Sequence, residues 1–407
     1  MLFMGTIGTF FLISPRAGLA LLGSEIFNHF SSYSLTAFPM FILAGSLAFA
    51  AGIGDRIFSA CYTILRRLPG SLVIASIASC AGFSAICGSS TATAATMGKV
   101  ALPIMRRFKY DDSLATGAIA VAGGLGPLIP PSVILILYGI LTEQSIGKLF
   151  VAGILPGIMI AGMLILTAVL LCVRNPALAP LGPPVSTKEK LNGLVGAGEA
   201  IILFSAVIGG LFLGWFTPTQ AGAALAAAVL ALSLARRQIK WPGFLGSVND
   251  AIRITCMIMV IMAGGIIFSR FMALTHIPIV LSDLMVALPV PPFVIMIIIL
   301  SMYVITGFFM DAMGVFVLTL PIVFPTVLAI GFDPIWFGVM IVVTGETAVI
   351  TPPLAVNVYV IHGVAEDVPI GTIFKGIWPF LGTLVIAIII LMIFPQIATY
   401  LPNIMTY

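Results

Sequence analysis

Several long stretches of this sequence contain no acidic or basic side chain. Five of them reach the length of about 20 residues that a membrane-spanning helix needs: residues 26–54, 149–173, 200–235, 284–310 and 376–407. Only 8% of the 407 residues are charged, against about a quarter in an ordinary globular protein. The sequence therefore predicts a polytopic membrane protein with roughly ten crossings. It excludes a soluble enzyme, a nucleic-acid-binding protein and a disordered scaffold.

The charged residues form no continuous surface, and the cysteines and histidines form no metal-binding motif. The net charge of +4 is too small for a continuous basic face, and the basic residues form short clusters such as Arg66-Arg67 and Arg106-Arg107. Such clusters are typical of cytoplasmic loops. The five cysteines contain no CxxC pair, the three histidines lie far apart, and no HExxH or GxSxG motif occurs. We therefore expect neither a metal-thiolate site nor an enzyme.

Two segments do not fit a simple membrane span. If the clusters at Arg66 and Arg106 are both cytoplasmic, the chain between them must enter the membrane and return, because two full spans leave no residues for a turn. The midpoint of this segment is 88–93, a run of small and hydroxyl residues. The segment 293–332 has a similar centre at 307–314. We expect two re-entrant helical hairpins, whose tips are tolerated at membrane depth only where they are buried or line a cavity.

These two segments begin an internal repeat. Leu-Pro-Ile follows each tip, at 102–104 and at 320–322. An aspartate comes next, and a Pro-Pro pair follows it. The distance is 19 positions from Asp111 to Pro130 and again 19 from Asp333 to Pro352. The chain therefore contains two copies of one structural unit.

Each copy carries a helix break. Residues 124–132 and 344–353 are expected to be non-helical, because proline removes a backbone donor and glycine loosens the chain. A single proline commonly kinks a spanning helix. Two matching breaks, each after a hairpin tip, instead indicate the binding site of a transporter, where freed amides suit an anion and freed carbonyls suit sodium.

Polar side chains within these segments are candidate ligands. Ser89, Ser90, Thr91 and Thr93 either contact an ion or substrate or serve as small packing residues. Asp311 is either a functional intramembrane acid or a tip residue that reaches water. The same two interpretations apply to Glu346 and Asn357, and Asn357 is better placed because it directly follows the second break.

At these positions the sequence resembles the large membrane subunit (DctM-like permease) of tripartite ATP-independent periplasmic (TRAP) transporters. The resembling segments are 38–45, 88–98, 123–132, 214–221 and 307–357, and they extend over almost the whole chain. The resemblance implies an all-α polytopic membrane protein with two inverted repeats, each containing a re-entrant hairpin and a broken helix. It further implies an elevator-type secondary transporter in the inner membrane of a bacterium. Gln220 departs from the pattern, since the family commonly has glutamate there.

The resemblance also implies a function and its site residues. The function is sodium-coupled import of an organic acid, a carboxylate-type anion. A periplasmic binding protein delivers it, a small membrane subunit completes the system, and no organic cofactor takes part. The implied sodium contacts are Ser89, Ser90, Thr91, Gly126, Gly307, Thr344, Gly345 and Thr351. The implied substrate contacts are Ser89, Pro131, Ser132, Pro353, Asn357 and Asp311.

The predicted organisation follows the repeat. The first membrane repeat covers 1–178, with its hairpin at about 70–105 and its broken helix at about 113–141. A proline-rich connecting loop covers 179–192. The second repeat covers 193–407, with its hairpin at about 293–332 and its broken helix at about 334–363. The alternative function is a stand-alone ion or organic-anion permease of related architecture.

Overall fold

The computed structural model describes residues 1–180 and 187–405, and within these ranges every regular element is helical. The first repeat contains α1 (Leu2–Leu12), α2 (Pro15–Phe30), α3 (Ala37–Ala50), α4 (Ile53–Leu65), α5 (Ser71–Cys87), α6 (Ser90–Arg107), α7 (Asp112–Gly123), α8 (Val133–Thr142) and α9 (Ile146–Arg174). The second contains α10 (Thr187–Phe212), α11 (Pro218–Ala235), α12 (Trp241–Thr275), α13 (Ile277–Val286), α14 (Pro292–Gly307), α15 (Ala312–Ala329), α16 (Pro334–Ile350), α17 (Val356–Val364), α18 (Ile370–Ile393) and α19 (Gln396–Ile404). Short 3-10 helices occupy Tyr33–Thr36 and Pro176–Leu178.

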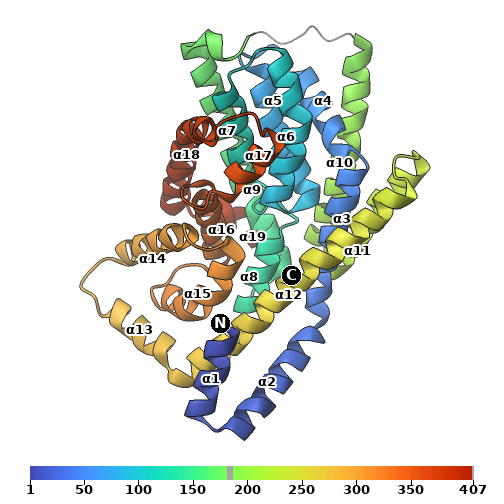
Figure 1. The fold of residues 1–407 in the computed structure, drawn as a ribbon. Helices are drawn as coiled ribbons and strands as arrows, with labels where there is room; N and C mark the ends of the chain where they lie inside the picture. Colours follow the sequence, from blue (N-terminus) through green and yellow to red (C-terminus); the bar gives the residue numbers. More distant parts are fainter. Residues whose placement is uncertain (181–186, 406–407) are drawn as a thin grey trace.

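Long apolar helices account for the membrane character of the chain. Six helical segments of the described residues are long and apolar enough to cross a bilayer: Tyr33–Ala50, Ile146–Arg174, Pro218–Ala235, Trp241–Thr275, Ala312–Ala329 and Ile370–Ile393. Shorter apolar helices, among them α5, α8, α14 and α16, lie next to turns and breaks. Figure 1 shows the longest helix, α12, running obliquely through the molecule and packing against α1 near its lower end.

Each repeat contains a helix pair followed by an interrupted helix. In the first repeat α5 and α6 are joined at Gly88 and Ser89, and α7 and α8 are separated by residues 124–132. In the second repeat α14 and α15 are joined at residues 308–311, and α16 and α17 are separated by residues 351–355. Asp111 and Asp333 occupy the same place in the two copies, because each caps the first half of an interrupted helix.

The second break is shorter than the sequence predicted. Helix α16 continues to Ile350, so residues 344–350 are helical and only the chain around Pro352-Pro353 departs from helix. Proline disfavours helical geometry in the residue before it, here Thr351, but leaves the bonds of earlier residues intact. A single glycine at 345 costs only about 1 kcal/mol. The first break contains two further glycines and Pro127, and it opens over its whole predicted length.

The connection between the repeats is also shorter than predicted. Helix α10 begins at Thr187, inside the interval 179–192 that was predicted as a loop, while residues 181–186 lie outside the described part of the chain. Lys188, Glu189, Lys190 and Leu191 all have high helix propensity. Pro184 is the last proline of this interval, so no proline opposes a helix that begins at Thr187.

Two groups of ion pairs join different parts of the chain. Glu199 of α10 is buried and forms ion pairs with Arg56 of α4 (3.3 Å) and with Arg236 after α11. Arg106 at the end of α6 donates to Asp112 (3.2 Å) and to Asp367 (2.9 Å), which links the first repeat to the loop before α18. The hydrogen bond from Arg106 holds the pKa of Asp367 below its usual range.

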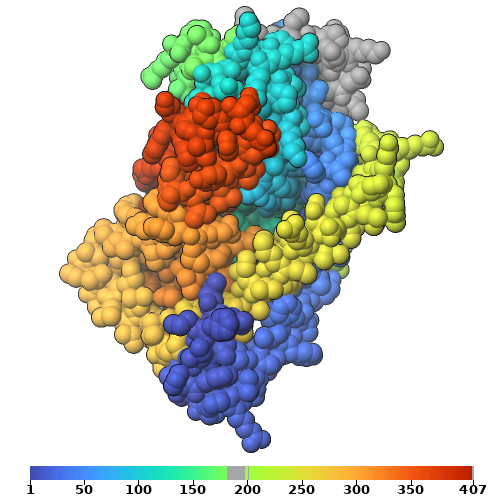
Figure 2. Space-filling model, in the orientation of Figure 1, coloured from blue at the N-terminus to red at the C-terminus, as the bar shows by residue number. Residues whose placement is uncertain are grey.

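Helix α18 packs against both interrupted helices. Trp336 of α16 donates its indole N–H to the Leu391 carbonyl oxygen (2.9 Å). On the other side Gly376 lies directly against α7, where an added Cβ would overlap the Ser113 carbonyl oxygen and approach Gly117 Cα to 3.1 Å. Figure 2 shows the resulting body, in which the red C-terminal helices lie against the cyan helices of the first repeat.

We expect Gly376→Ala to destabilise the protein, because the new methyl group forces α18 away from α7. Overpacking of this kind costs about 1–3 kcal/mol. Thermal unfolding of the purified protein in detergent measures the effect as a lower melting temperature. Gly382→Ala is the matched control, since it lies on the same helix and its Cβ would meet nothing within 4 Å. Equal melting temperatures for the two variants would contradict this packing.

Candidate functional site

The tip of the first hairpin is pressed against the first helix break. Gly88 ends α5 with φ +66, and an added Cβ would overlap the Pro131 carbonyl oxygen. Only glycine fits both the left-handed backbone and the close approach. Ser89 then caps α6, accepting a hydrogen bond from the Ala92 N–H (3.4 Å). The tip is therefore held with its polar backbone facing the break.

Gly126 makes a second close approach at the same place. A Cβ there would lie 2.5 Å from the Ser89 carbonyl oxygen and 2.9 Å from the Ser90 nitrogen. The backbones of the tip and the break are thus in direct contact. Because residue 126 has no side chain, the break can approach the peptide group between Ser89 and Ser90 this closely.

Asn357 joins this region to the second break. The Ser90 hydroxyl donates to Asn357 Oδ1 (2.9 Å), and Asn357 Nδ2 donates to the Ala120 carbonyl oxygen (3.1 Å). Asn357 is fully buried and lies in the first turn of α17. One amide side chain therefore connects the first hairpin, the first interrupted helix and the second interrupted helix.

The second hairpin makes a similar contact within its own repeat. A Cβ on Gly307 would lie 2.5 Å from Ala348 Cβ, and one on Gly345 would lie 2.7 Å from Phe316 Cζ. Asp311 caps α15 by accepting a hydrogen bond from the Met313 N–H (3.1 Å). Asp311 is exposed at the surface. This tip reaches the molecular surface, in contrast to the largely buried first tip.

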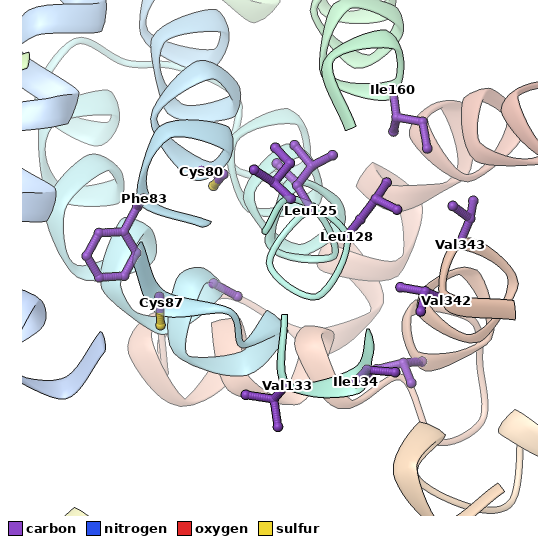
Figure 3. Packing of buried hydrophobic residues seen from close by; sticks show 14 of the residues in the cluster. Cys80, Phe83, Cys87, Leu125, Leu128, Val133, Ile134, Ile160, Val342 and Val343 are labelled. Atoms are coloured by element: carbon purple, nitrogen blue, oxygen red, sulfur yellow. The ribbon is translucent and has the colours of Figure 1, made fainter. Parts of the chain in front are cut away.

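Apolar side chains close the space around the first break. Figure 3 shows Leu125 and Leu128 of the break near Ile160 and Val343, which come from α9 and α16. The same four side chains line a small cavity together with Gly124 and Glu346. The polar groups of the site are therefore surrounded by hydrocarbon, where each unpaired polar atom has a high energetic cost.

The donor chemistry of the site fits a small hard cation. The hydroxyl oxygens of Thr93 and Thr344 are buried and make no hydrogen bond within the described residues. The Ser89 carbonyl oxygen accepts from the Thr93 N–H (3.1 Å), lies beside Gly126 and keeps a second lone pair for an ion. Freed carbonyl and hydroxyl oxygens are what sodium sites in broken-helix transporters use.

The structure gathers most of the predicted residues into two groups. Ser89, Ser90, Gly126, Pro131 and Asn357 lie together around the first tip, while Gly307, Thr344 and Gly345 lie at the contact of α14, α15 and α16. Two others use their hydroxyls in local bonds, since Ser132 caps α8 and Thr351 donates to the Thr347 carbonyl oxygen. Thr91, Pro353 and Asp311 are exposed.

Three further residues lie at this site. Thr93 belongs to the same hydroxyl run as Thr91, and burial distinguishes it from the exposed Thr91. Gly124 lies within the first break. Glu346 is a lone acid in an apolar run, and position along the chain does not reveal that it faces the first break.

A second, larger pocket is lined by other residues than those of this site. It has a volume of about 510 Å³ and is lined by residues that include Tyr33, Gln144 and Thr217. Gln220, the departure from the family pattern, also lines it and forms a capping box with Thr217 at the start of α11. The glutamine carbonyl accepts from the Thr217 N–H (2.9 Å), as a carboxylate in a capping box does.

The comparison with protein families decides between the possible transporter classes. Residues 1–397 match the model for the tripartite ATP-independent periplasmic transporter, DctM component. The chain belongs to this family. It is accordingly the large permease component of a TRAP transporter, a multi-pass protein of the bacterial inner membrane and not an enzyme.

Individual relatives of this TRAP permease agree over nearly the full length. It is 32% identical to the C4-dicarboxylate TRAP transporter large permease protein DctM of Vibrio cholerae, over 97% of this chain and 92% of that protein. It is 30% identical to the sialic acid TRAP transporter large permease protein SiaM of the same organism, with the same coverage. Among solved structures, the YdaH transporter of Alcanivorax borkumensis has the same fold, with a TM-score of 0.63, 14% identity and coverage of 95% of this chain and 90% of that one.

Asn357→Ala is expected to lower transport activity about tenfold or more, since it leaves the Ser90 hydroxyl and the Ala120 carbonyl oxygen without their buried partner. Initial uptake rates in proteoliposomes measure the loss. Asn403→Ala, at an exposed asparagine, is the control and should behave as the parent protein does. Undiminished uptake by Asn357→Ala would reject the bridge as part of the transport site.

Proposed function

We propose that this permease imports an organic acid together with sodium. The main support for this proposal is that the N-termini of three helices lie close together. Helix α6 begins at Ser90 and α17 begins beside Asn357, and these two residues are hydrogen-bonded. The chain just before α8 contacts the first tip through Pro131 and Gly88.

Helix N-termini carry free N–H groups and the positive end of the helix dipole, and both favour an anion. Three of them facing one region make a carboxylate a suitable substrate even without a nearby arginine or lysine. The relatives transport anions of this kind, C4-dicarboxylates and sialic acid. The proposed substrate class is therefore an organic acid, bound near Ser89, Pro131, Ser132, Pro353, Asn357 and Asp311.

Sodium is the proposed coupling ion because unpaired hydroxyl oxygens lie on α6 of the first hairpin and on α16, the first half of the second interrupted helix. Thr93 and Thr344 offer buried hydroxyls without partners in the described chain. The proposed sodium contacts are those implied by the resemblance: Ser89, Ser90, Thr91, Gly126, Gly307, Thr344, Gly345 and Thr351. Cations held there would add positive charge next to the helix N-termini and so strengthen binding of the anion.

The proposed partners follow from the family. A periplasmic binding protein would deliver the acid, and a small membrane subunit would pack against the permease within the lipid bilayer. We further propose an elevator-type movement, in which both hairpins and both broken helices move as one body. The contacts of Asn357 with the first repeat and of α18 with α7 support this, because they join the two repeats.

Proteoliposomes that contain the permease and the small subunit should accumulate the acid when the binding protein is present outside and sodium is higher outside. Replacing external sodium with choline should reduce accumulation to background. Persistent uptake in choline would contradict sodium coupling. Full uptake by the permease without either partner would instead identify a stand-alone permease.

Thr344→Val should raise the sodium concentration for half-maximal uptake about tenfold, because it removes a hydroxyl oxygen while keeping the side-chain shape. Thr347→Val is the matched control on the same helix. Thr347 is not among the proposed sodium contacts, and its hydroxyl donates to the Val343 carbonyl oxygen. If both variants show the parental sodium dependence, Thr344 is not a sodium ligand.

A further inference from the structure

Two glutamates are buried in the described part of the chain, and their surroundings differ completely. Glu199 is paired with Arg56 and Arg236. Glu346 is 5% exposed and has no ion pair among the described residues. Its Oε2 atom also makes no hydrogen bond there. A buried charge is normally compensated by an opposite charge, so Glu346 lacks the partner that Glu199 has.

Glu346 lies deep within the helical body. It is on α16, which begins at Pro334, and at 1.5 Å per residue this places it about 18 Å from the start of that helix. Every residue of α16 from Ile335 to Ile350 is buried. Water at the ends of the protein therefore does not screen this carboxyl group.

The carboxyl group points from the second repeat toward the first helix break. A Cβ on Gly124 would lie 3.3 Å from Glu346 Oε2. The same Cβ would lie 3.2 Å from the Val121 carbonyl oxygen, so a backbone oxygen of the first repeat is also near the carboxyl group. Neither group supplies a positive charge.

A small cavity adjoins the carboxyl group. Its lining includes Val121, Gly124, Leu125, Leu128 and Glu346. Its volume of about 10 Å³ is room for the centre of one water-sized particle. The other side chains of its lining are aliphatic, so Glu346 is the only ionisable group at this cavity, and backbone oxygens of the first break would supply the further ligands of a bound cation.

We propose that Glu346 supplies the fixed negative charge that holds a transported sodium ion beside the first helix break. This inference rests on the sodium coupling proposed above and adds an anionic ligand from the second repeat to a site otherwise built from neutral oxygens.

The test is sodium-dependent thermal stabilisation of the purified permease with its small subunit in detergent, with choline keeping the ionic strength constant. A ligand that binds only the folded state raises the melting temperature with its concentration. We expect Glu346→Gln to move the midpoint of this stabilisation to about tenfold higher sodium or beyond. Glu346→Asp should fall between the two, because it keeps the charge on a shorter side chain.

Glu366→Gln is the matched control, since Glu366 is an exposed acid, and its midpoint should equal that of the parent protein. Should Glu346→Gln fail to fold, Gly124→Ala provides the second variant, because its methyl group narrows the same cavity. Gly363→Ala, whose Cβ would meet nothing within 4 Å, is the control for that change. The midpoint should rise in Gly124→Ala and stay unchanged in Gly363→Ala.

The outcomes separate this inference from the proposed function. A parental midpoint in Glu346→Gln or, where that variant does not fold, in Gly124→Ala would overturn the assignment of Glu346, and sodium coupling would stand. A parent protein that sodium does not stabilise, and that transports equally well in choline, would overturn both. A raised midpoint in the Glu346 or Gly124 variant with unchanged controls supports the anionic ligand.

Discussion

The rest of the structure depends on the need to satisfy every backbone polar group inside an apolar environment. A continuous helix does this within itself, but two helices here are interrupted at 124–132 and 351–355. The interruptions are tolerated because other parts of the chain meet them. Gly88 and Gly126 let the first hairpin tip touch the first break, and Asn357 bonds to both Ser90 and Ala120.

The same contacts explain how a chain with so little charge can bind ions. Amide groups at the starts of α6 and α17, carbonyl oxygens at the first break and hydroxyls on Thr93 and Thr344 provide polarity without net charge. Glu346 is the exception, as an acid at the centre that lacks an ion-pair partner among the described residues. The proposed anion site, the proposed sodium sites and the proposed role of Glu346 therefore all depend on the same arrangement of helix ends.

Much of the architecture could be predicted from the sequence because its strongest signals are local. Charge-free runs, Pro-Pro pairs and the equal spacing from Asp111 to Pro130 and from Asp333 to Pro352 are visible without coordinates. The length of the second break was overestimated, because the bonds of α16 before Thr351 do not involve the prolines. Which candidates face one another depended on packing between the repeats. The sequence therefore did not distinguish buried Thr93 from exposed Thr91, and it did not place Glu346 against Gly124.

Coupled import requires that sodium and the organic acid cross the membrane together through this permease. Both can be followed at once, with radioactive sodium and a labelled acid in the same proteoliposomes containing all three components. We expect sodium entry to rise in fixed proportion to entry of the acid and to fall to background when the acid is omitted. Entry of the acid without accompanying sodium would contradict coupled import.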